Sequence, residues 1–187
     1  MADSTSRIIE VIHHCRLCDS SSLEHSFALP DTPLANDFRP IQDKGLKYEQ
    51  YPLELLRCTI CSHVQLRHVV DPVSLFSTYA YVSGTSATFV NHFKNYASWI
   101  QKDLRLDPTS KILEIGSNDG TLLKFLKSLG YQCIGIDPAV NIVNDIDTEG
   151  IELICSFFDR SVATSINEKY GELDLIVANN VFAHIWK

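Results

Sequence analysis

A loop bracketed by Gly116 and Gly120 lies at the centre of the residues that could do chemistry. A mostly apolar run precedes the loop and a helix-like pattern follows it, which indicates a strand, a loop and a helix. Glycine lets the backbone approach a ligand where a Cβ would collide, and the first amides of the helix would point at that ligand. Asp137 ends the next apolar run, where a carboxylate can accept hydrogen bonds from both hydroxyls of a ribose. The unit therefore predicts a ligand that carries a nucleoside.

The residues inside the loop narrow the choice of ligand. The dinucleotide pattern G-x-G-x-x-G is absent, and no lysine follows Gly120 as a P-loop would require. Glu114 and Asp119 add negative charge, which suits a cation better than a diphosphate. The pattern E-x-G-x-x-x-G, with an acidic end to the second strand, resembles the S-adenosylmethionine loop of class I methyltransferases. A structural turn whose glycines contact no ligand is the alternative.

Four of the six cysteines form two C-x-x-C pairs, Cys15 with Cys18 and Cys58 with Cys61. Two such pairs can close a tetrahedral thiolate site, the usual arrangement for structural zinc. A thioredoxin-type dithiol is the alternative, but it needs one pair, placed at the start of a helix after a buried strand. We therefore favour zinc, and the long interval between the pairs predicts a hairpin or a small subdomain between them.

Three histidines and two cysteines lie outside this pattern. His13, His14 and His63 are close to the pairs and could replace a thiolate, although we expect surface positions near the site. Cys133 and Cys155 fall in apolar strand patterns, where we expect buried and inert thiols.

The composition restricts the partners that the chain can have. Of its 187 residues, 45% are hydrophobic and 21% are charged, and the net charge is −7. The negative charge and the lack of a basic run argue against a nucleic-acid partner. No apolar stretch approaches the ~20 residues of a membrane span, and the N-terminus has no signal-peptide pattern. We therefore expect a cytoplasmic protein with no membrane partner.

The candidate residues must be positioned by alternating strands and helices. Strands are expected near residues 111–116, 132–137, 151–156 and 173–179, and helices near 120–129, 139–148 and 159–169. Gly130, Gly150 and Gly171 fall where the three helices should end, as left-handed caps do. Four β–α repeats with right-handed crossovers give a parallel sheet.

The sequence before this region divides into three parts. Residues 1–12 form a polar tail, and residues 13–76 are rich in proline, which favours a small domain that needs zinc for its fold. Residues 77–106 lead into a helix, which Asp107-Pro108 should end before the region that starts at residue 107. One face of this helix carries an apolar stripe, which consists of Val90, Phe93, Ala97, Ile100 and Leu104. The N-cap of the helix is expected to be Thr85 or Ser86.

Further motifs accompany the loop and the cysteine pairs. In chain order they are Pro33-Leu34-Ala35-Asn36-x-Phe38, Tyr51-Pro52-Leu53, Val64-Gln65-Leu66, Val70-Asp71-Pro72, Tyr79-x-Tyr81-x-Ser83-Gly84-x-Ser86 and Asn180-Val181-Phe182-Ala183-His184. The whole set, from about residue 13 to 185, resembles the S-adenosylmethionine-dependent sugar C-methyltransferases of deoxysugar pathways. The resemblance implies an α/β chain: a small N-terminal zinc-binding domain, then at 107–187 the first half, about four parallel strands, of a class I methyltransferase Rossmann-like fold.

The resemblance also implies cofactors and a reaction. The cofactors are S-adenosylmethionine and a structural Zn²⁺, and the substrate is a nucleotide-linked sugar that is methylated on a carbon beside a ketone. A base must remove the proton from that carbon, and the carbanion then attacks the methyl group of the sulfonium. Methylation of an oxygen or a nitrogen on another small acceptor is a further option that the loop does not distinguish.

Site residues follow from the same resemblance. Gly116, Ser117 and Gly120 would line the methionine end of the cofactor, with Glu114 and Asp119 in the same loop region. Asp137 would hold the ribose, Phe157 or Phe158 the adenine face, and Asn179 the amino-acid moiety. His184, Tyr79 and Tyr81 are the candidate catalytic residues. A structural histidine, packed tyrosines and core phenylalanines are the alternatives.

The family resembled here carries a C-terminal part with a further acid/base group, which does not follow His184 in this sequence. The chain is accordingly a fragment, one half of a split enzyme, or a repurposed short protein. A sheet without its remaining strands has an open edge, which predicts a homo-oligomer or a separate C-terminal half that covers it. A non-catalytic module that binds zinc and S-adenosylmethionine is the alternative to an enzyme.

Overall fold

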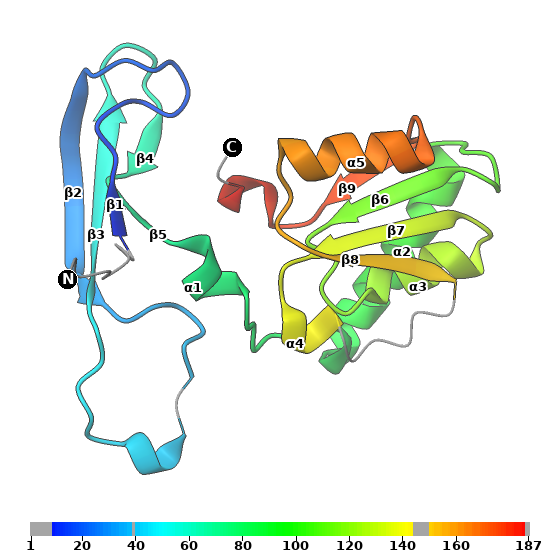
Figure 1. The fold of residues 1–187 in the computed structure, drawn as a ribbon, viewed down its shortest axis with the longest axis horizontal. Coiled ribbons are helices and arrows are strands. Elements are labelled where there is room, and N and C mark those ends of the chain that lie inside the picture. The colour runs from blue at the N-terminus through cyan, green and yellow to red at the C-terminus, as the bar shows by residue number, and fades with distance from the viewer. Residues whose placement is uncertain (1–8, 39, 144–149, 186–187) are drawn as a thin grey trace, which may run out of the picture. The chain divides into compact units, whose positions relative to one another are not determined.

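The computed structural model describes residues 9–38, 40–143 and 150–185. The chain forms two compact units, Met1–Leu75 and Phe76–Lys187 (Figure 1). No described helix is both long and apolar enough to cross a membrane.

The first unit is built from short antiparallel sheets. Its elements are β1 (Ile9–Val11), β2 (Leu23–Thr32), a 3-10 turn at Ile41–Asp43, β3 (Tyr51–Cys58), β4 (Val64–Leu66), β5 (His68–Val70) and the start of α1 (Pro72–Phe76). Strand β1 pairs with β5, and β3 lies between β2 and β4. Strands β2 and β3 form a long hairpin, which confirms the hairpin expected between the two cysteine pairs.

The second unit contains a parallel sheet of four strands. They are β6 (Lys111–Ile115), β7 (Gln132–Asp137), β8 (Ile151–Cys155) and β9 (Leu175–Ala178). Their order, β8-β7-β6-β9, is that of the first four strands of a Rossmann sheet, so the predicted strands and their parallel arrangement are confirmed. The chain reverses its direction of progress across the sheet between β6 and β9, and ligands of such sheets bind beyond the carboxyl ends of the strands at that point.

Helices cover both faces of this sheet. They are α2 (Ala87–Asp103), α3 (Thr121–Ser128), α4 (Val140–Val143) and α5 (Arg160–Tyr170), with 3-10 turns at Ser83–Thr85 and Phe182–His184. Apolar residues of α2 and α3 pack on one face, which carries Ile112 and Cys133, and Ile166 of α5 packs on the other, which carries Leu113 and Ile134 (Figure 1). Because neighbouring strand residues point to opposite faces, β6, β7 and β8 contribute to both cores, whereas β9 contributes Leu175 and Val177 to the first one and leaves Ile176 exposed.

Helix α2 belongs to the core of the second unit. Ser86 caps it by accepting a hydrogen bond from the N–H of Phe89, and Phe93, Ala97 and Ile100 are buried. The predicted end at Asp107-Pro108 is wrong, since α2 ends at Asp103 and Arg105 adopts a φ of 50°, which an α-helix does not accommodate.

The ends of two later helices agree with the glycine pattern. Gly130 follows α3 and Gly171 follows α5, and both have positive φ angles, although the ψ of Gly171, −155°, lies outside the left-handed helical region. Gly150 also has a positive φ, but the residues just before it lie outside the described part of the chain. Of the helix expected over residues 139–148, the structure describes Val140–Val143, and the rest lies outside the described residues.

The two remaining cysteines differ from each other. Cys133 is buried, as predicted, and burial raises its pKa to about 12. Cys155 is exposed, so the prediction of a buried thiol is wrong at this position. It ends β8, which is an edge strand of the sheet, and an edge strand lacks one of the neighbours that would cover it.

Candidate cofactor site and metal centre

The four paired cysteines converge on one point of the first unit. Their sulfur atoms all lie within 4.8 Å of one another, with Cys15 3.5 Å from Cys61 and Cys18 3.6 Å from Cys58. A tetrahedral zinc with Zn–S bonds of about 2.3 Å would place its sulfurs about 3.8 Å apart, so the spacing fits this ion. Among the described residues, the histidines near the pairs do not join the group.

Each cysteine pair lies on the same kind of turn. The N–H of Asp19 donates to the carbonyl of Cys15, and the N–H of Ser62 donates to the carbonyl of Cys58. Asp19 and Ser62 follow the second cysteine of their pairs and have φ angles of 61° and 64°. Backbone N–H groups, chiefly that of Cys61, lower the pKa of Cys58 to about 7, whereas the neighbouring thiols and burial raise that of Cys18 to about 12, so Cys58 is the thiol of this close pair that more readily becomes a thiolate.

Gln65 joins the two turns. It is buried in β4, accepts a hydrogen bond of 2.8 Å from the N–H of Arg16, and donates one of 2.9 Å to the carbonyl of His14. Its side chain thereby fixes the first cysteine turn to the strand that follows the second one. We did not predict this role, because a glutamine in a strand pattern does not indicate its partner.

The glycine loop connects β6 to α3 at the carboxyl edge of the parallel sheet. Gly116 and Ser117 both donate their N–H groups to the carbonyl of Ile136, so the loop begins against β7. A Cβ on Gly116 would lie 2.8 Å from Val181, whereas a Cβ on Gly120 would meet no described atom within 4 Å. Gly116 therefore serves a close contact inside the protein, while Gly120 leaves room that a ligand can use.

Asp137 is the anchor of this loop. Its carboxylate is buried and accepts hydrogen bonds of 2.9 Å from the N–H of Asn118 and from the N–H of Ala139. Each carboxylate oxygen has two lone pairs, so each keeps one for a further donor.

The polar side chains in the middle of the loop bind the segment before α2. Asp119 accepts hydrogen bonds from the N–H of Gly84 and from the N–H and hydroxyl of Thr121. The amide of Asn118 accepts from the N–H of Ser83 and donates to the carbonyl of Tyr81. We predicted Asp119 to be a cofactor residue. Its carboxylate already serves three donors of the protein, so a direct contact with a ligand has less support here than at Glu114.

Glu114 lies at the end of β6, next to the end of β9. One carboxylate oxygen accepts a hydrogen bond of 3.2 Å from the side-chain amide of Asn179, and the other is buried without a partner among the described residues. Burial raises the pKa of Glu114 to about 8, the Asn179 amide lowers it, and Asp119 and Asp137 raise it further. The hydroxyl of Ser117 is likewise buried without a described partner. A ligand with several N–H donors would satisfy these oxygens.

Two of the three candidate catalytic residues lie beside Phe76. The ring of Phe76 lies 5.7 Å from that of His184 and 6.1 Å from that of Tyr79. His184 is exposed, and Tyr81, 39% exposed, packs edge-on against Phe89 at 6.0 Å. The structure thus places Tyr79 and His184 beside one aromatic ring and Tyr81 beside another.

The two adenine candidates have different surroundings. Phe158 packs against the core that includes Leu113 and Ile166. Phe157 is half-buried and is not part of either described core cluster, so it is the better candidate for a ligand contact.

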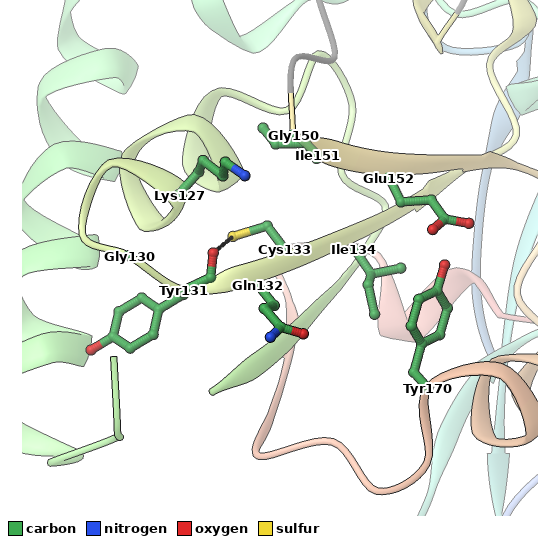
Figure 2. A pocket seen from close by; sticks show the side chains of 10 residues that line it. All are labelled: Lys127, Gly130, Tyr131, Gln132, Cys133, Ile134, Gly150, Ile151, Glu152 and Tyr170. Carbon is green, nitrogen blue, oxygen red and sulfur yellow. Dashed lines mark hydrogen bonds between the residues drawn. The ribbon is translucent and has the colours of Figure 1, made fainter. Parts of the chain in front are cut away.

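A hollow of about 510 Å³ lies at the opposite, amino edge of the sheet. Figure 2 shows its wall, which the ends of α3 and α5 and the starts of β7 and β8 supply, including Lys127, Cys133, Glu152 and Tyr170. It contains none of the predicted site residues, and the thiol of Cys133 faces the carbonyl of Tyr131 at 3.7 Å. The candidate site is therefore defined by the loop and the strand ends and not by this hollow.

Two family models match the chain. One, described as "Putative zinc binding domain", matches residues 15–76, and the other, described as "Methyltransferase domain", matches residues 89–186. The first match includes all four clustered cysteines, and the second includes the parallel sheet and the glycine loop.

A curated relative is the C-methyltransferase NovU of Streptomyces niveus, which is 28% identical over 178 residues. The match covers 95% of this chain and 42% of NovU, so the chain spans less than half of that relative. Among solved structures, a SAM-dependent methyltransferase from Agrobacterium tumefaciens is 15% identical with a TM-score of 0.36, covering 67% of this chain and 36% of that one. The plantazolicin methyltransferase BpumL, in complex with SAH, is 16% identical with a TM-score of 0.31, covering 48% and 34%. Because these TM-scores are low, the evidence for the fold is the strand order of the parallel sheet itself.

Proposed function

Because this chain belongs to the methyltransferase domain family, whose model matches residues 89–186, we propose that it binds S-adenosylmethionine at the carboxyl edge of its parallel sheet. In this proposal residues 13–76 form a zinc-binding domain, and residues 107–187 form the part of the chain that holds the cofactor. Residues 77–106 connect the two as a linker segment and a helix. We also propose that the protein is cytoplasmic. The bound cofactor would supply a methyl group made electrophilic by a positive sulfonium.

The buried carboxylate of Glu114 is the observation that carries this proposal. An ammonium group has three N–H donors, and Glu114 has one buried oxygen without a described partner. Ser117 adds a second buried acceptor beside the loop, and Asn179 orients the Glu114 side chain. Glu114 and Ser117 would therefore hold the charged methionine end of the cofactor, with Asn179 beside it.

The rest of the cofactor would follow the strand ends. Asp137 keeps one lone pair on each oxygen for the two ribose hydroxyls, while its other lone pairs hold the loop. Phe157, which comes after β8, would pack against the adenine. Gly120 would allow the loop to approach the ligand, because no described atom fills the position of its missing Cβ.

The reaction that we propose is methylation of a carbon beside a ketone in a nucleotide-linked deoxysugar. The similarity to NovU, a C-methyltransferase, supports carbon as the acceptor. His184, which is exposed, would accept or relay the proton of that carbon, and Tyr79 and Tyr81 would donate hydrogen bonds to the oxygen on which charge develops. A non-catalytic module that binds zinc and S-adenosylmethionine is the alternative function.

The open edge of strand β9 suggests that another polypeptide takes part in this reaction. It pairs with β6 along one side, has no strand partner along the other among the described residues, and leaves Ile176 56% exposed. An open edge of this kind invites another strand. We therefore propose that a second copy or a separate C-terminal half adds to β9. Small-angle scattering that finds a dispersed, well-folded monomer would contradict the homo-oligomer.

Turnover separates the enzyme from the binding module. Zinc-loaded protein would be incubated with S-adenosylmethionine and a panel of keto-deoxysugar nucleotides, and the products identified by mass spectrometry. A product heavier by one methylene, in step with S-adenosylhomocysteine, supports the enzyme. Binding of the cofactor without any methylated product, also after a C-terminal half is supplied, supports the module.

A further inference from the structure

Residues 77–84, which we call the tyrosine segment, carry Tyr79 and Tyr81 and precede α2. The segment is held from two sides by elements that follow β6 and β7 (Figure 1). These hydrogen bonds join residues that are 35 to 62 positions apart in the sequence, so they define where the backbone of the segment lies relative to the glycine loop and α4.

Asn118 holds the C-terminal half of the tyrosine segment. Its side-chain oxygen accepts a hydrogen bond of 2.9 Å from the N–H of Ser83, and its side-chain nitrogen donates one of 2.9 Å to the carbonyl of Tyr81. Asp119 adds a bond of 2.8 Å from the N–H of Gly84. One amide side chain thus imitates the donor and acceptor of a neighbouring backbone.

Asn141 holds the N-terminal half in the same way. It lies in α4, accepts a hydrogen bond of 3.0 Å from the N–H of Tyr79, and donates one of 2.8 Å to the carbonyl of Tyr79. The N–H of Val140 donates to the carbonyl of Ser77 beside it. The backbone of Tyr79 is therefore fixed by both of its polar groups.

Both asparagines are tied to the Asp137 carboxylate. One oxygen of Asp137 accepts from the N–H of Asn118, and the other accepts from the N–H of Ala139, two residues before Asn141. A ligand at Asp137 would therefore contact a group that positions both supports of the tyrosine segment.

We propose that Asn118 and Asn141 are positioning residues that hold the tyrosine segment against the cofactor loop and make its order depend on occupancy at Asp137. This inference rests on the proposed function, because Tyr79 and Tyr81 matter as groups that face the substrate. Occupancy at Asp137 stabilises the loop and the start of α4, and the segment held by both becomes more ordered. The converse also holds, since an ordered segment favours cofactor binding by linkage.

Amide hydrogen exchange, followed by NMR on the zinc-loaded protein, tests the proposal. Asn118→Gly removes the side chain but keeps the backbone N–H and tolerates the φ of 49° at this position. Asn141→Ala removes both bonds to Tyr79. Asn91→Ala, an exposed asparagine on α2, is the matched control.

Without ligand, we expect the amide of Ser83 to exchange about tenfold faster in Asn118→Gly, and that of Tyr79 about tenfold faster in Asn141→Ala, since each loses its acceptor. Amides of β7 should keep their rates in both variants, and Asn91→Ala should match the wild type throughout. Unchanged rates at Tyr79 and Ser83 would overturn the positioning role. Equal acceleration in β7 would also overturn it, because that result indicates general destabilisation.

With saturating S-adenosylhomocysteine, exchange at Tyr79 and Ser83 should slow in the wild type. In the double variant the ligand should still bind, but the slowing at these two amides should disappear. Slowing of the same size in the double variant would overturn the claim that the two asparagines make the order of the segment depend on ligand occupancy. If the wild type does not bind S-adenosylhomocysteine at all, the proposed function fails and this dependence fails with it. The ligand-free rates still decide separately whether the two asparagines hold the segment.

Discussion

The side-chain amide of Asn179 donates a hydrogen bond of 3.2 Å to the carboxylate of Glu114, across the point where the sheet reverses its strand order. Glu114 lies on β6, and Asn179 directly follows β9, the neighbouring strand that comes last in the sequence. The bond uses one oxygen of a buried carboxyl group and leaves the other without a described partner. An acidic group of this kind is suited to a positively charged ligand that arrives from outside the protein.

Glu114 should make stability depend on pH. Its pKa is raised, chiefly by burial, from 4.5 to about 8, so the folded state binds a proton that the unfolded state has lost over this range. The free energy of unfolding should therefore fall as pH rises from 4.5 to 8, by on the order of 4 kcal/mol in total. Chemical denaturation of wild type and Glu114→Gln at several pH values between 5.5 and 8 measures this.

The variant Glu114→Gln has no group to titrate at this position. Its free energy of unfolding should fall less steeply with pH than that of the wild type, under identical zinc-saturated conditions. Parallel curves for the two proteins would show that the Glu114 carboxyl does not contribute the expected linkage.

The two loop glycines should respond differently to alanine. Gly116→Ala places a Cβ 2.8 Å from Val181 at a φ of 71°, so it should lower the free energy of unfolding by about 2–4 kcal/mol. Gly120→Ala adds strain at a φ of 68° but meets no described atom, so it should cost about 1–2 kcal/mol.

The binding of S-adenosylhomocysteine tests whether the ligand occupies the space beside Gly120. If the space beside Gly120 belongs to the ligand, Gly120→Ala should weaken binding about tenfold or more at a temperature where both variants are folded. Equal affinity for Gly120→Ala and the wild type would mean that this space lies outside the ligand site.

Metal removal should unfold the first unit. The protein should contain one zinc ion per chain, since four sulfurs lie within 4.8 Å of one another. Chelation, or Cys15→Ser, should abolish dispersed NMR signals from the described part of residues 9–70, while signals of the parallel sheet remain because its core contains no metal ligand. Cys155→Ser is the matched control, as Cys155 is exposed and outside the cluster. Full structure in the metal-free protein would argue against a structural metal.

Local patterns in the sequence were sufficient for part of this architecture. The paired cysteines, the four strands and the glycines that follow α3 and α5 depend on spacing within one segment or on repeats of one motif. The exposure of Cys155 was not predictable in this way, because an apolar strand pattern does not state whether the strand lies at an edge.

The roles of Asn118, Asn141 and Gln65 also escaped the sequence patterns. Each side chain binds backbone groups that lie 35 or more positions away in the sequence, and an asparagine in a loop or a glutamine in a strand is compatible with many partners. The partners of these side chains could be identified only from the folded structure, in which the elements lie next to one another. The sequence shows that the loop is polar in its middle, but it does not show that two of those polar side chains bind the protein itself.

Calorimetric titration of the zinc-loaded protein with S-adenosylhomocysteine, for the wild type and for Asp137→Ala, tests the central claim most directly. Asp137 holds the loop through Asn118 and keeps one lone pair on each oxygen for the ribose. We expect saturable binding of one ligand per chain. The affinity should be at least about tenfold lower in Asp137→Ala, because the variant loses about two hydrogen bonds between the ligand and a charged group. No heat of binding to the wild type at millimolar ligand, or equal affinity in the two proteins, would contradict it.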